Sequence, residues 1–197
     1  LPLKSKEDFI SSFKNSLSTK TKVIFLSHIT SATGLIFPVN EICQIAKDNN
    51  IFCIIDGAHA PAHIPLNIKK LDPDIYVGAC HKWMCAPKGV SFLYAKKKIQ
   101  NEIEPLVVSW GYESDMPSHS QFLDYHQWQG TNDPSSYLTI PDVINFLDKN
   151  KWNNVSKNCC KTNRIARNKL NNFLNQPPIS EDEFIGQMSS IKIPFLK

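Results

Sequence analysis

The chain has 197 residues, of which 42% are hydrophobic, so it is long enough to bury one sizeable core. Its net charge of +4 is spread along the chain instead of forming one basic block, which gives nucleic-acid binding little support. The N-terminus lacks the apolar stretch of a signal peptide, and no apolar run approaches the roughly 20 residues that span a bilayer, so we expect no membrane partner. The six cysteines lie mostly in apolar runs, beside the candidate site or on a helical pattern, which favours free thiols and a cytoplasmic protein.

The first part of the chain predicts strands that alternate with helices. Ser5 is a suitable cap for a helix over residues 5–17, and the apolar run 23–26 is typical of a strand buried on both faces. Pro38 opens a second helix, in which one face carries Val39, Ile42, Cys43 and Ala46. Further strands are predicted at 51–55, 75–78 and 91–95. This alternation predicts an α/β fold with a mostly parallel sheet and helices on both faces.

The second part of the chain is predicted to be helical after an irregular region. Residues 105–133 show no clear periodicity, which is typical of a long functional loop region. Two helices follow, one near 135–148 with Pro141 in its early turns and one near 151–174. The last helix carries an apolar stripe formed by Trp152, Val155, Cys159, Ala166, Leu170 and Phe173.

These elements predict three regions. Residues 1–150 would form a large domain that is incomplete at its N-terminus, and residues 151–175 a connecting helix. Residues 176–197 would begin a small C-terminal α+β domain that is truncated. The lack of an initiator Met and the ending KIPFLK, which has the pattern of a strand, indicate a segment of a longer chain.

Polar residues follow the predicted strands at three places, namely 28–33, 56–59 and 81–82. Open sheets of this kind bind ligands beyond the carboxyl ends of their strands, so these residues predict a site along one rim. Pyridoxal 5'-phosphate (PLP) requires a lysine that forms a Schiff base and moves protons, and a carboxylate that keeps the pyridine nitrogen protonated. Lys82 and Asp56 lie at neighbouring strand ends and provide both groups.

Four segments, in this order and spacing, resemble class V (cysteine-desulfurase-like) PLP enzymes of fold type I: SHITSATGLIFPV, IIDGAHAPAHIPL, GACHKWMCAPKGVSFLY and WQGTNDPSSYL. The likeness is strongest to the isopenicillin N epimerase-like subgroup and runs from about residue 20 to 150, more weakly to the end. It implies the large domain of a fold type I PLP-dependent transferase and an enzyme acting on an amino acid through an external aldimine. It further implies a homodimer with shared active sites.

The resemblance also implies roles for individual residues. Lys82 would be the Schiff-base lysine, Asp56 the partner of the pyridinium nitrogen, and His59 a neighbour of the cofactor's phenolic oxygen. His81 matches the residue that precedes the lysine in this family and is expected near the phosphate.

Three further positions match cofactor-binding motifs of the family. Ser31 aligns with an Asn that contacts the cofactor in desulfurases, and Thr30 lies beside it, so either could reach the ring. Thr131 matches a Gly-Thr motif that reaches the phosphate of the partner subunit's cofactor in related dimers, which is why a homodimer is expected.

The sequence departs from the family pattern at three positions. Ala79 and Cys80 stand where Ser or Thr often binds the phosphate, so the phosphate would depend on His81, backbone amides and residues upstream. Asn132 replaces an Arg that is common in the epimerase-like subgroup, which leaves the substrate class open.

Other interpretations use the same residues. A cysteine desulfurase or related C–S lyase is the alternative enzyme, but the nucleophilic cysteine of a desulfurase would lie beyond this chain, and Cys159 and Cys160 come too early. A catalytically silent homologue that serves as a scaffold or dimer partner is a third hypothesis, which the presence of both Asp56 and Lys82 opposes.

The remaining histidines have simpler interpretations. His59 and His63 lie four residues apart, but Pro61 between them and the lack of a third ligand argue against zinc, so no metal is expected. His63 is expected to be a structural or rim residue. His28 could contact the cofactor or only cap its strand.

Overall fold

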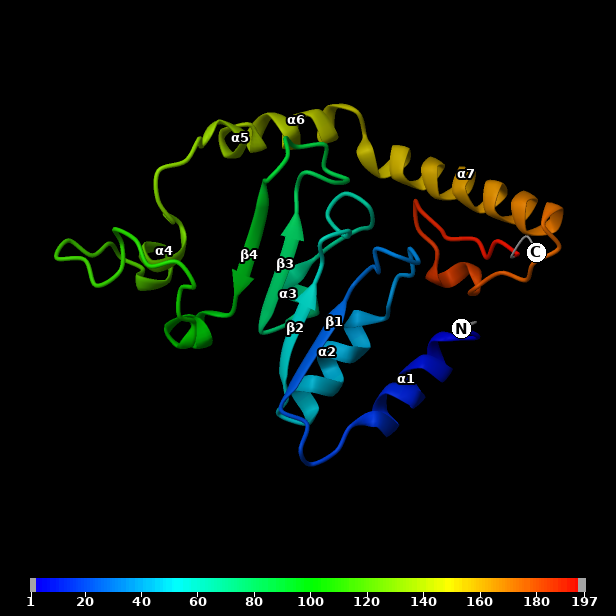
Figure 1. Ribbon diagram of the computed structural model, residues 1–197, viewed down its shortest axis with the longest axis horizontal. Helices are drawn as coiled ribbons and strands as arrows, with labels where there is room; N and C mark the ends of the chain where they lie inside the picture. Colours follow the sequence, from blue (N-terminus) through cyan, green and yellow to red (C-terminus); the bar gives the residue numbers. More distant parts are fainter. Residues whose placement is uncertain (1–2, 195–197) are drawn as a thin grey trace.

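A four-stranded sheet forms the centre of the protein. The computed structural model describes residues 3–194. The strands lie in the order β1 to β4, with the bounds Val23–Ser27, Phe52–Asp56, Ile75–Ala79 and Ser91–Ala95. β1, β2 and β3 are parallel, whereas β4 pairs with β3 in the antiparallel direction (Figure 1). The predicted α/β fold with a mostly parallel sheet is confirmed, and β4 adds an antiparallel edge to it.

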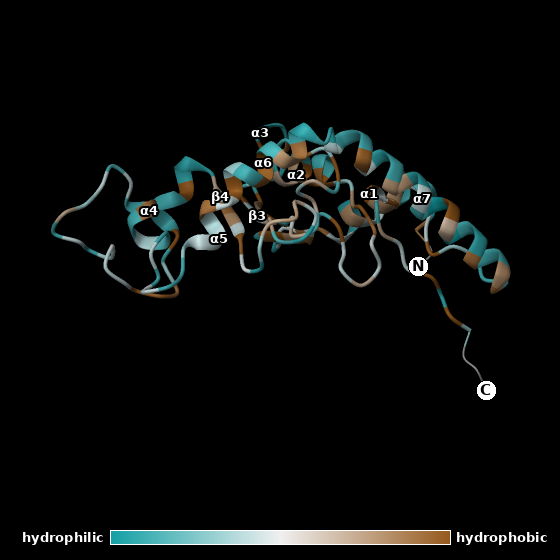
Figure 2. Ribbon diagram, turned by 90° about the horizontal axis from the view of Figure 1, so that it is seen from above, coloured by the Kyte–Doolittle hydropathy of each residue, from teal (hydrophilic) through white to brown (hydrophobic). Residues whose placement is uncertain are grey.

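Three helices lie on one side of this sheet, namely α1 (Lys6–Ser16), α2 (Val39–Asp48) and α3 (Ile68–Leu71) (Figures 1 and 2). The side chain of Ser5 caps α1 by accepting a hydrogen bond from the amide of Asp8, as the sequence predicts. All four apolar residues predicted on one face of α2 are buried. They form the main core with residues from three strands, namely Ile24, Cys53, Ile55 and Tyr76.

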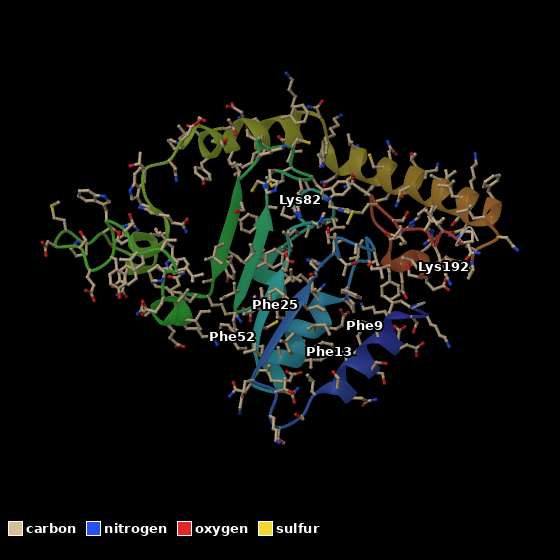
Figure 3. The ribbon with its side chains drawn as sticks, in the orientation of Figure 1. Phe9, Phe13, Phe25, Phe52, Lys82 and Lys192 are labelled. Atoms are coloured by element: carbon tan, nitrogen blue, oxygen red, sulfur yellow. The ribbon has the colours of Figure 1, made fainter. Side chains whose placement is uncertain are left out.

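The opposite face of the sheet carries apolar side chains that no other part of residues 3–194 covers fully. Val23, Phe25, Val77 and Leu93 are 53%, 67%, 37% and 43% exposed (Figure 3 labels Phe25). Helices were expected on both faces. α1, α2 and α3 cover one face, and on the other Phe122 of the short helix α4 (Gln121–His126) packs in a small cluster with Ala95 of β4. Because side chains alternate along a strand, Asp56 at the end of β2 belongs to this open face.

The second part of the chain is helical, with the elements η1 (Lys97–Glu102), α4 (Gln121–His126), α5 (Ser135–Leu138), α6 (Ile140–Lys149), α7 (Trp152–Phe173) and η2 (Asp182–Phe184). The helix predicted near 135–148 is divided at Thr139, because Pro141 occupies the first turn of a new helix. The irregular region 105–133 contains the short helix α4, which the sequence analysis did not predict. No helix within the described residues is long and apolar enough to cross a membrane.

The apolar stripe predicted on α7 is largely exposed. Leu170 and Phe173 are exposed, whereas the buried residues of this helix are Arg167 and Asn171. Arg167 donates a hydrogen bond to the carbonyl oxygen of Ser180 and pairs with Asp182. α7 therefore contacts the following segment through polar groups. The proposed start of a small domain at 176–197 includes 195–197, which lie outside the described residues.

Candidate active site

Asp56 is the last residue of β2, and its carboxylate is held in place by two donors. Oδ1 accepts a hydrogen bond from the amide of Ala58 at 3.0 Å, and Oδ2 accepts one from the hydroxyl of Ser27 at 3.3 Å. Ser27 ends β1 and stands opposite Asp56 in the parallel register. The carboxylate is therefore fixed at the carboxyl ends of two strands, where an α/β sheet binds its ligands.

Lys82 lies on the connection between β3 and β4, which we call the lysine hairpin (residues 80–90). The amides of Cys80 and His81 both donate to the carbonyl oxygen of Val90, at 2.9 and 3.3 Å, and close the base of this hairpin. Cys85 has a left-handed backbone with a φ of 64°, which is strained for a residue other than glycine. Figure 3 shows Lys82 beyond the carboxyl ends of β2 and β3.

His59 lies between Lys82 and Trp83. Its Nε2 is 3.0 Å from Nζ of Lys82, and its Nδ1 accepts a hydrogen bond from the indole N–H of Trp83 at 3.2 Å. Burial lowers the pKa of His59, and the charge of Lys82 lowers it further, whereas Asp56 acts in the opposite direction. The structure thus brings together three of the residues predicted from the sequence, namely Asp56, His59 and Lys82.

His81 and Thr30 use their polar groups within their own loops. Nδ1 of His81 donates a hydrogen bond to the carbonyl oxygen of Val90 at 3.0 Å, so the ring is tied to the lysine hairpin. Oγ1 of Thr30 lies 2.5 Å from Oγ1 of Thr33 and accepts a hydrogen bond from the amide of Leu35. The hydroxyl of Thr30 is therefore occupied in stabilising the turn after β1.

Ser31 and Thr131 are exposed, and neither makes a side-chain hydrogen bond to another described residue. Of the two residues in the first loop, Ser31 thus has the available hydroxyl. Thr131 lies between α4 and α5 and has no hydrogen bond to Lys82, Asp56 or His59 in the described part of the chain.

His63 was expected to be a structural or rim residue, but its place in a cluster that supports His59 and Trp83 was not predicted from the sequence. His63 is buried, and its ring centroid is 4.1 Å from that of Trp83. Nε2 of His63 accepts a hydrogen bond from the amide of Gln187 at 2.7 Å, and the side chain of Gln187 donates to the carbonyl oxygen of His63. The position of Trp83 directly after Lys82 was the only local signal of this cluster.

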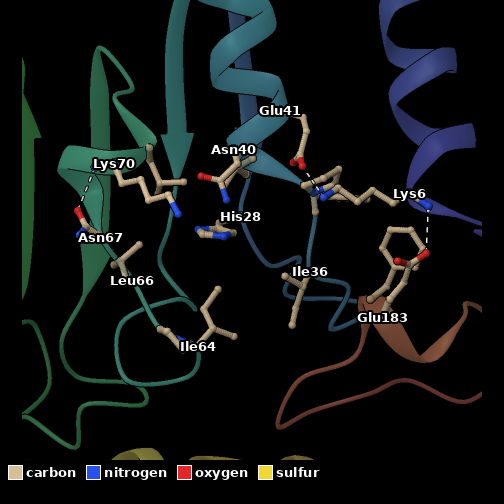
Figure 4. Close-up of a pocket in the computed structure, with 16 residues that line it drawn as sticks. Lys6, His28, Ile36, Asn40, Glu41, Ile64, Leu66, Asn67, Lys70 and Glu183 are labelled. Atoms are coloured by element: carbon tan, nitrogen blue, oxygen red, sulfur yellow. Dashed lines mark hydrogen bonds and ion pairs between the residues drawn. The ribbon is translucent and has the colours of Figure 1, made fainter.

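The amide of His28 donates a hydrogen bond to the carbonyl oxygen of Asp56 at 2.8 Å, but its side chain makes no hydrogen bond to Asp56, His59 or Lys82 among the described residues. Nδ1 of His28 is 2.9 Å from the hydroxyl of Tyr76, and its ring points into a pocket of about 650 Å³ beside the N-terminus of α2 (Figure 4). Asp56, His59 and Lys82 do not line this pocket. Of the two interpretations of His28, the structure thus favours a role at the end of the strand. Within residues 3–194, no three His, Cys, Asp or Glu side chains lie close enough to hold a metal ion.

The two buried histidines predict that the protein loses stability in acid. Burial lowers the pKa of His28 and of His63 from 6.5 to about 4. Between these values the unfolded chain binds protons that the folded chain does not, so the free energy of unfolding should fall as the pH drops from 6.5 to about 4. Each ring would contribute up to about 3 kcal/mol, and the loss should level off at lower pH.

Urea unfolding of the full-length protein between pH 7 and 4 measures this loss. The variants His28→Gln and His63→Gln should each reduce the pH dependence, whereas His119→Gln, which changes an exposed ring, should leave it as it is. A pH dependence that neither buried variant reduces would contradict the prediction.

Comparison with known proteins identifies relatives of this chain. The family model "Aminotransferase class-V" matches residues 4–182. The chain is 28% identical over 204 aligned positions to an isopenicillin N epimerase from Amycolatopsis lactamdurans, which covers 98% of this chain and 51% of that protein. It is 30% identical over 156 positions to an L-cysteine desulfhydrase from Arabidopsis thaliana, covering 75% of this chain and 33% of that protein.

A solved structure shows the same fold. The apo cysteine desulfurase from Thermococcus onnurineus NA1 aligns with a TM-score of 0.77 at 19% identity, over 98% of this chain and 48% of that one. The chain therefore spans about half the length of the first relative and of this structure. The match over residues 4–182 shows that the chain belongs to the aminotransferase class-V family of PLP-dependent enzymes.

Proposed function

We propose that the full-length protein is a PLP-dependent enzyme that acts on an amino acid and breaks a bond at its Cα or beyond. Lys82 is the residue that binds the cofactor covalently and transfers protons. The observation that carries this proposal is the contact of Lys82 with His59 at the rim where the Asp56 carboxylate is fixed. The family match supports the same cofactor.

The residues at this rim fit PLP. When bound, the cofactor supplies an aldehyde for a primary amine and a ring that accepts the electron pair of a broken bond. Lys82 offers an exposed primary amine on a hairpin that its own hydrogen bonds hold in place. Asp56 offers a carboxylate whose orientation is set by Ser27 and Ala58 and which can stabilise a positive charge on a ring nitrogen.

Each of these residues has a defined task in the proposal. Nζ of Lys82 takes a proton from the substrate and returns it, as a general base and then a general acid. Asp56 keeps the ring nitrogen protonated. His59 has its Nε2 beside Nζ of Lys82 and would lie near the phenolic oxygen of the bound cofactor. Ser31 is proposed as a ring contact, and His81 and the hairpin amides as neighbours of the phosphate.

A homodimer with shared active sites is part of this proposal. Thr131 is exposed and makes no hydrogen bond to the candidate site of its own chain, so it is available to a second copy. We also propose the division into a large domain over 1–150, a connecting helix over 151–175 and the start of a small domain from 176.

Within this class we propose epimerase-like chemistry, with a C–S lyase as the second candidate because an L-cysteine desulfhydrase is among the relatives. Sulfur transfer is not supported by Cys80, the cysteine nearest to Lys82 in the sequence. Cys80 lies two residues before Lys82, but it is buried, and burial raises the pKa of its thiol, which makes it a poor nucleophile.

Reduction of the full-length protein with borohydride in the presence of PLP tests the proposal. Peptide mass spectrometry should find the reduced adduct on Lys82, and Lys88, which is exposed in the same hairpin, should remain unmodified. An adduct on a different lysine, or no adduct, would refute the role of Lys82. Deuterium incorporation at Cα from heavy water would then favour the epimerase, whereas release of sulfide from L-cysteine would favour the lyase.

A further inference from the structure

His59 contacts two nitrogen groups at once, one on each ring nitrogen. The indole nitrogen of Trp83 lies 3.2 Å from Nδ1, and Nζ of Lys82 lies 3.0 Å from Nε2. Trp83 and Lys82 are adjacent in sequence, on the lysine hairpin, whereas His59 follows β2. The hydrogen atoms in these two contacts decide which protonation states the cluster permits.

The indole contact fixes the tautomer of His59. An indole N–H can only donate, so Nδ1 of His59 must accept. A neutral imidazole has one donor and one acceptor, and its proton therefore lies on Nε2. Nζ of Lys82 must then accept from Nε2–H, which a free amine does and an ammonium group, with three donors and no lone pair, cannot. If Lys82 is protonated, His59 cannot keep its hydrogen bonds to both Trp83 and Lys82.

We propose that Trp83 is a positioning residue whose indole N–H holds His59 in the Nε2–H tautomer and thereby favours the free-amine form of Lys82. A carbonyl group reacts with the free amine and not with the ammonium form, so Trp83 would prepare Lys82 for attack. This consequence for cofactor binding rests on the function proposed above, whereas the tautomer of His59 does not.

Contacts from distant segments hold the indole in the required orientation. Its ring lies against His63 at a centroid distance of 4.1 Å, and His63 is fixed through Nε2 by the amide of Gln187. The side chain of Gln187 in turn donates to the hydroxyl of Ser156 on α7 and to the carbonyl oxygen of His63. The orientation of Trp83 therefore depends on contacts that join the lysine hairpin to His63, to Gln187 and to Ser156 of α7.

Burial favours the neutral form of His59. Burial is the largest cause that lowers the pKa of His59, and it outweighs the opposite effect of Asp56 at the end of β2, so the ring does not need a charge on Lys82 to stay neutral. His63 faces the same cluster, and its pKa is also lowered by burial. His81 on the hairpin directs its Nδ1 to the carbonyl oxygen of Val90 instead.

The tautomer can be measured directly by nitrogen NMR. In the full-length protein without PLP, labelled with ¹⁵N-histidine and assigned by comparison with a His59→Gln variant, His59 should show protonated Nε2 and unprotonated Nδ1. A proton on Nδ1 in the unmodified protein would overturn the proposal, whether or not any variant of Trp83 folds.

The effect on Lys82 appears in the pH profile of its reaction with an amine reagent. Labelling by trinitrobenzenesulfonate, read for each lysine by mass spectrometry, reports the fraction of free amine. Trp83→Phe keeps an aromatic ring against His63 and removes the N–H. The midpoint for Lys82 should rise by roughly 0.4 to 1 pH unit, the equivalent of one net hydrogen bond. The profile of Lys88 in the same molecule should not move.

Two comparisons separate positioning from a general loss of structure. Trp152→Phe also removes an indole hydrogen bond, to the carbonyl oxygen of Ala62, and should leave the midpoint of Lys82 unchanged. In a His59→Gln background, Trp83→Phe should cause no further shift, because the indole acts through the imidazole. Equal shifts in Trp83→Phe and Trp152→Phe, or an undiminished shift without His59, would overturn the proposal. If Lys82 fails to trap PLP while the tautomer is as stated, the proposed function fails and the positioning role remains.

Discussion

Lys82→Ala in the full-length protein is expected to slow exchange of the substrate's Cα hydrogen with solvent by about 10²- to 10⁴-fold, the range that a positioned general acid or base contributes. In the proposed function Lys82, whose Nζ lies 3.0 Å from Nε2 of His59, both binds PLP covalently and transfers the proton, so its loss would remove both roles. Mass spectrometry of an amino acid substrate incubated in heavy water measures the rate.

The matched control for this variant is Lys88→Ala. Lys88 is also exposed on the lysine hairpin, six residues later, and contacts none of the candidate residues by a described hydrogen bond. We expect its variant to exchange hydrogen at the rate of the unmodified protein. Comparable rates for both variants would rule out Lys82 as the acid and base.

Asp56→Asn is expected to lower the same rate by at least about 100-fold while Lys82 still binds PLP. Asp56 is partly buried in the structure, and the bound cofactor would cover its carboxylate. Removing one partner of an ion pair that is buried in this way costs about 3–5 kcal/mol, and each 1.36 kcal/mol corresponds to a factor of ten in rate. Asn is close to Asp in size, and its oxygen can still accept from the amide of Ala58, so the loop after β2 should keep its shape. Borohydride trapping on Lys82 and the exchange rate are measured in the same preparation.

Asp74→Asn is the control for loss of a structural carboxylate. Asp74 directly precedes β3, at the end of the strand opposite the candidate site. It is buried, accepts a hydrogen bond from the amide of Cys53 and pairs with Lys96. Its variant should unfold at lower urea concentration with an unchanged exchange rate. If Asp56→Asn exchanges hydrogen within about twofold of the unmodified protein, the carboxylate does not support the ring nitrogen.

The strands show what sequence patterns can predict and what they leave open. The bounds of β4 match the predicted strand 91–95, because the apolar run and the turn before it are local features. Its direction was not predicted. The connection over 80–90 forms a hairpin, and hairpins join antiparallel strands, whereas a parallel strand needs a longer crossover. The short length of the connection therefore already indicated that β4 is antiparallel to β3.

The contact face of α7 could not be predicted from its own sequence. The apolar stripe of the helix is largely exposed, and Arg167 and Asn171 are buried instead. Carbonyl groups of the segment after the helix accept from Arg167 and Arg164, and these partners stand 13 to 21 residues away. A local pattern does not report which distant backbone groups will accept hydrogen bonds.

The sequence was enough to predict which residues form the candidate site, but not the hydrogen bonds that hold them in place. Asp56, His59 and Lys82 follow from strand ends and ordered motifs, and the structure brings them together. The contact of Gln187 with His63 joins residues 124 positions apart, so no local motif marks it. The proposal of Ser31 over Thr30 as the ring contact also needed the structure, because it rests on which hydroxyl the turn uses.

The lysine hairpin also has a consequence for how the protein folds. β3 and β4 are neighbours in sequence, from Ala79 paired with Ser91 out to Ile75 with Ala95, whereas β1 and β2 pair across the whole of α2. Closing a shorter loop loses less chain entropy, and contacts between distant residues form more slowly. We therefore expect the hairpin of β3 and β4, which carries Lys82, to form early in folding. Asp56 joins it only when β2 docks beside β3, so that the amine and the carboxylate meet as one of the later events of folding.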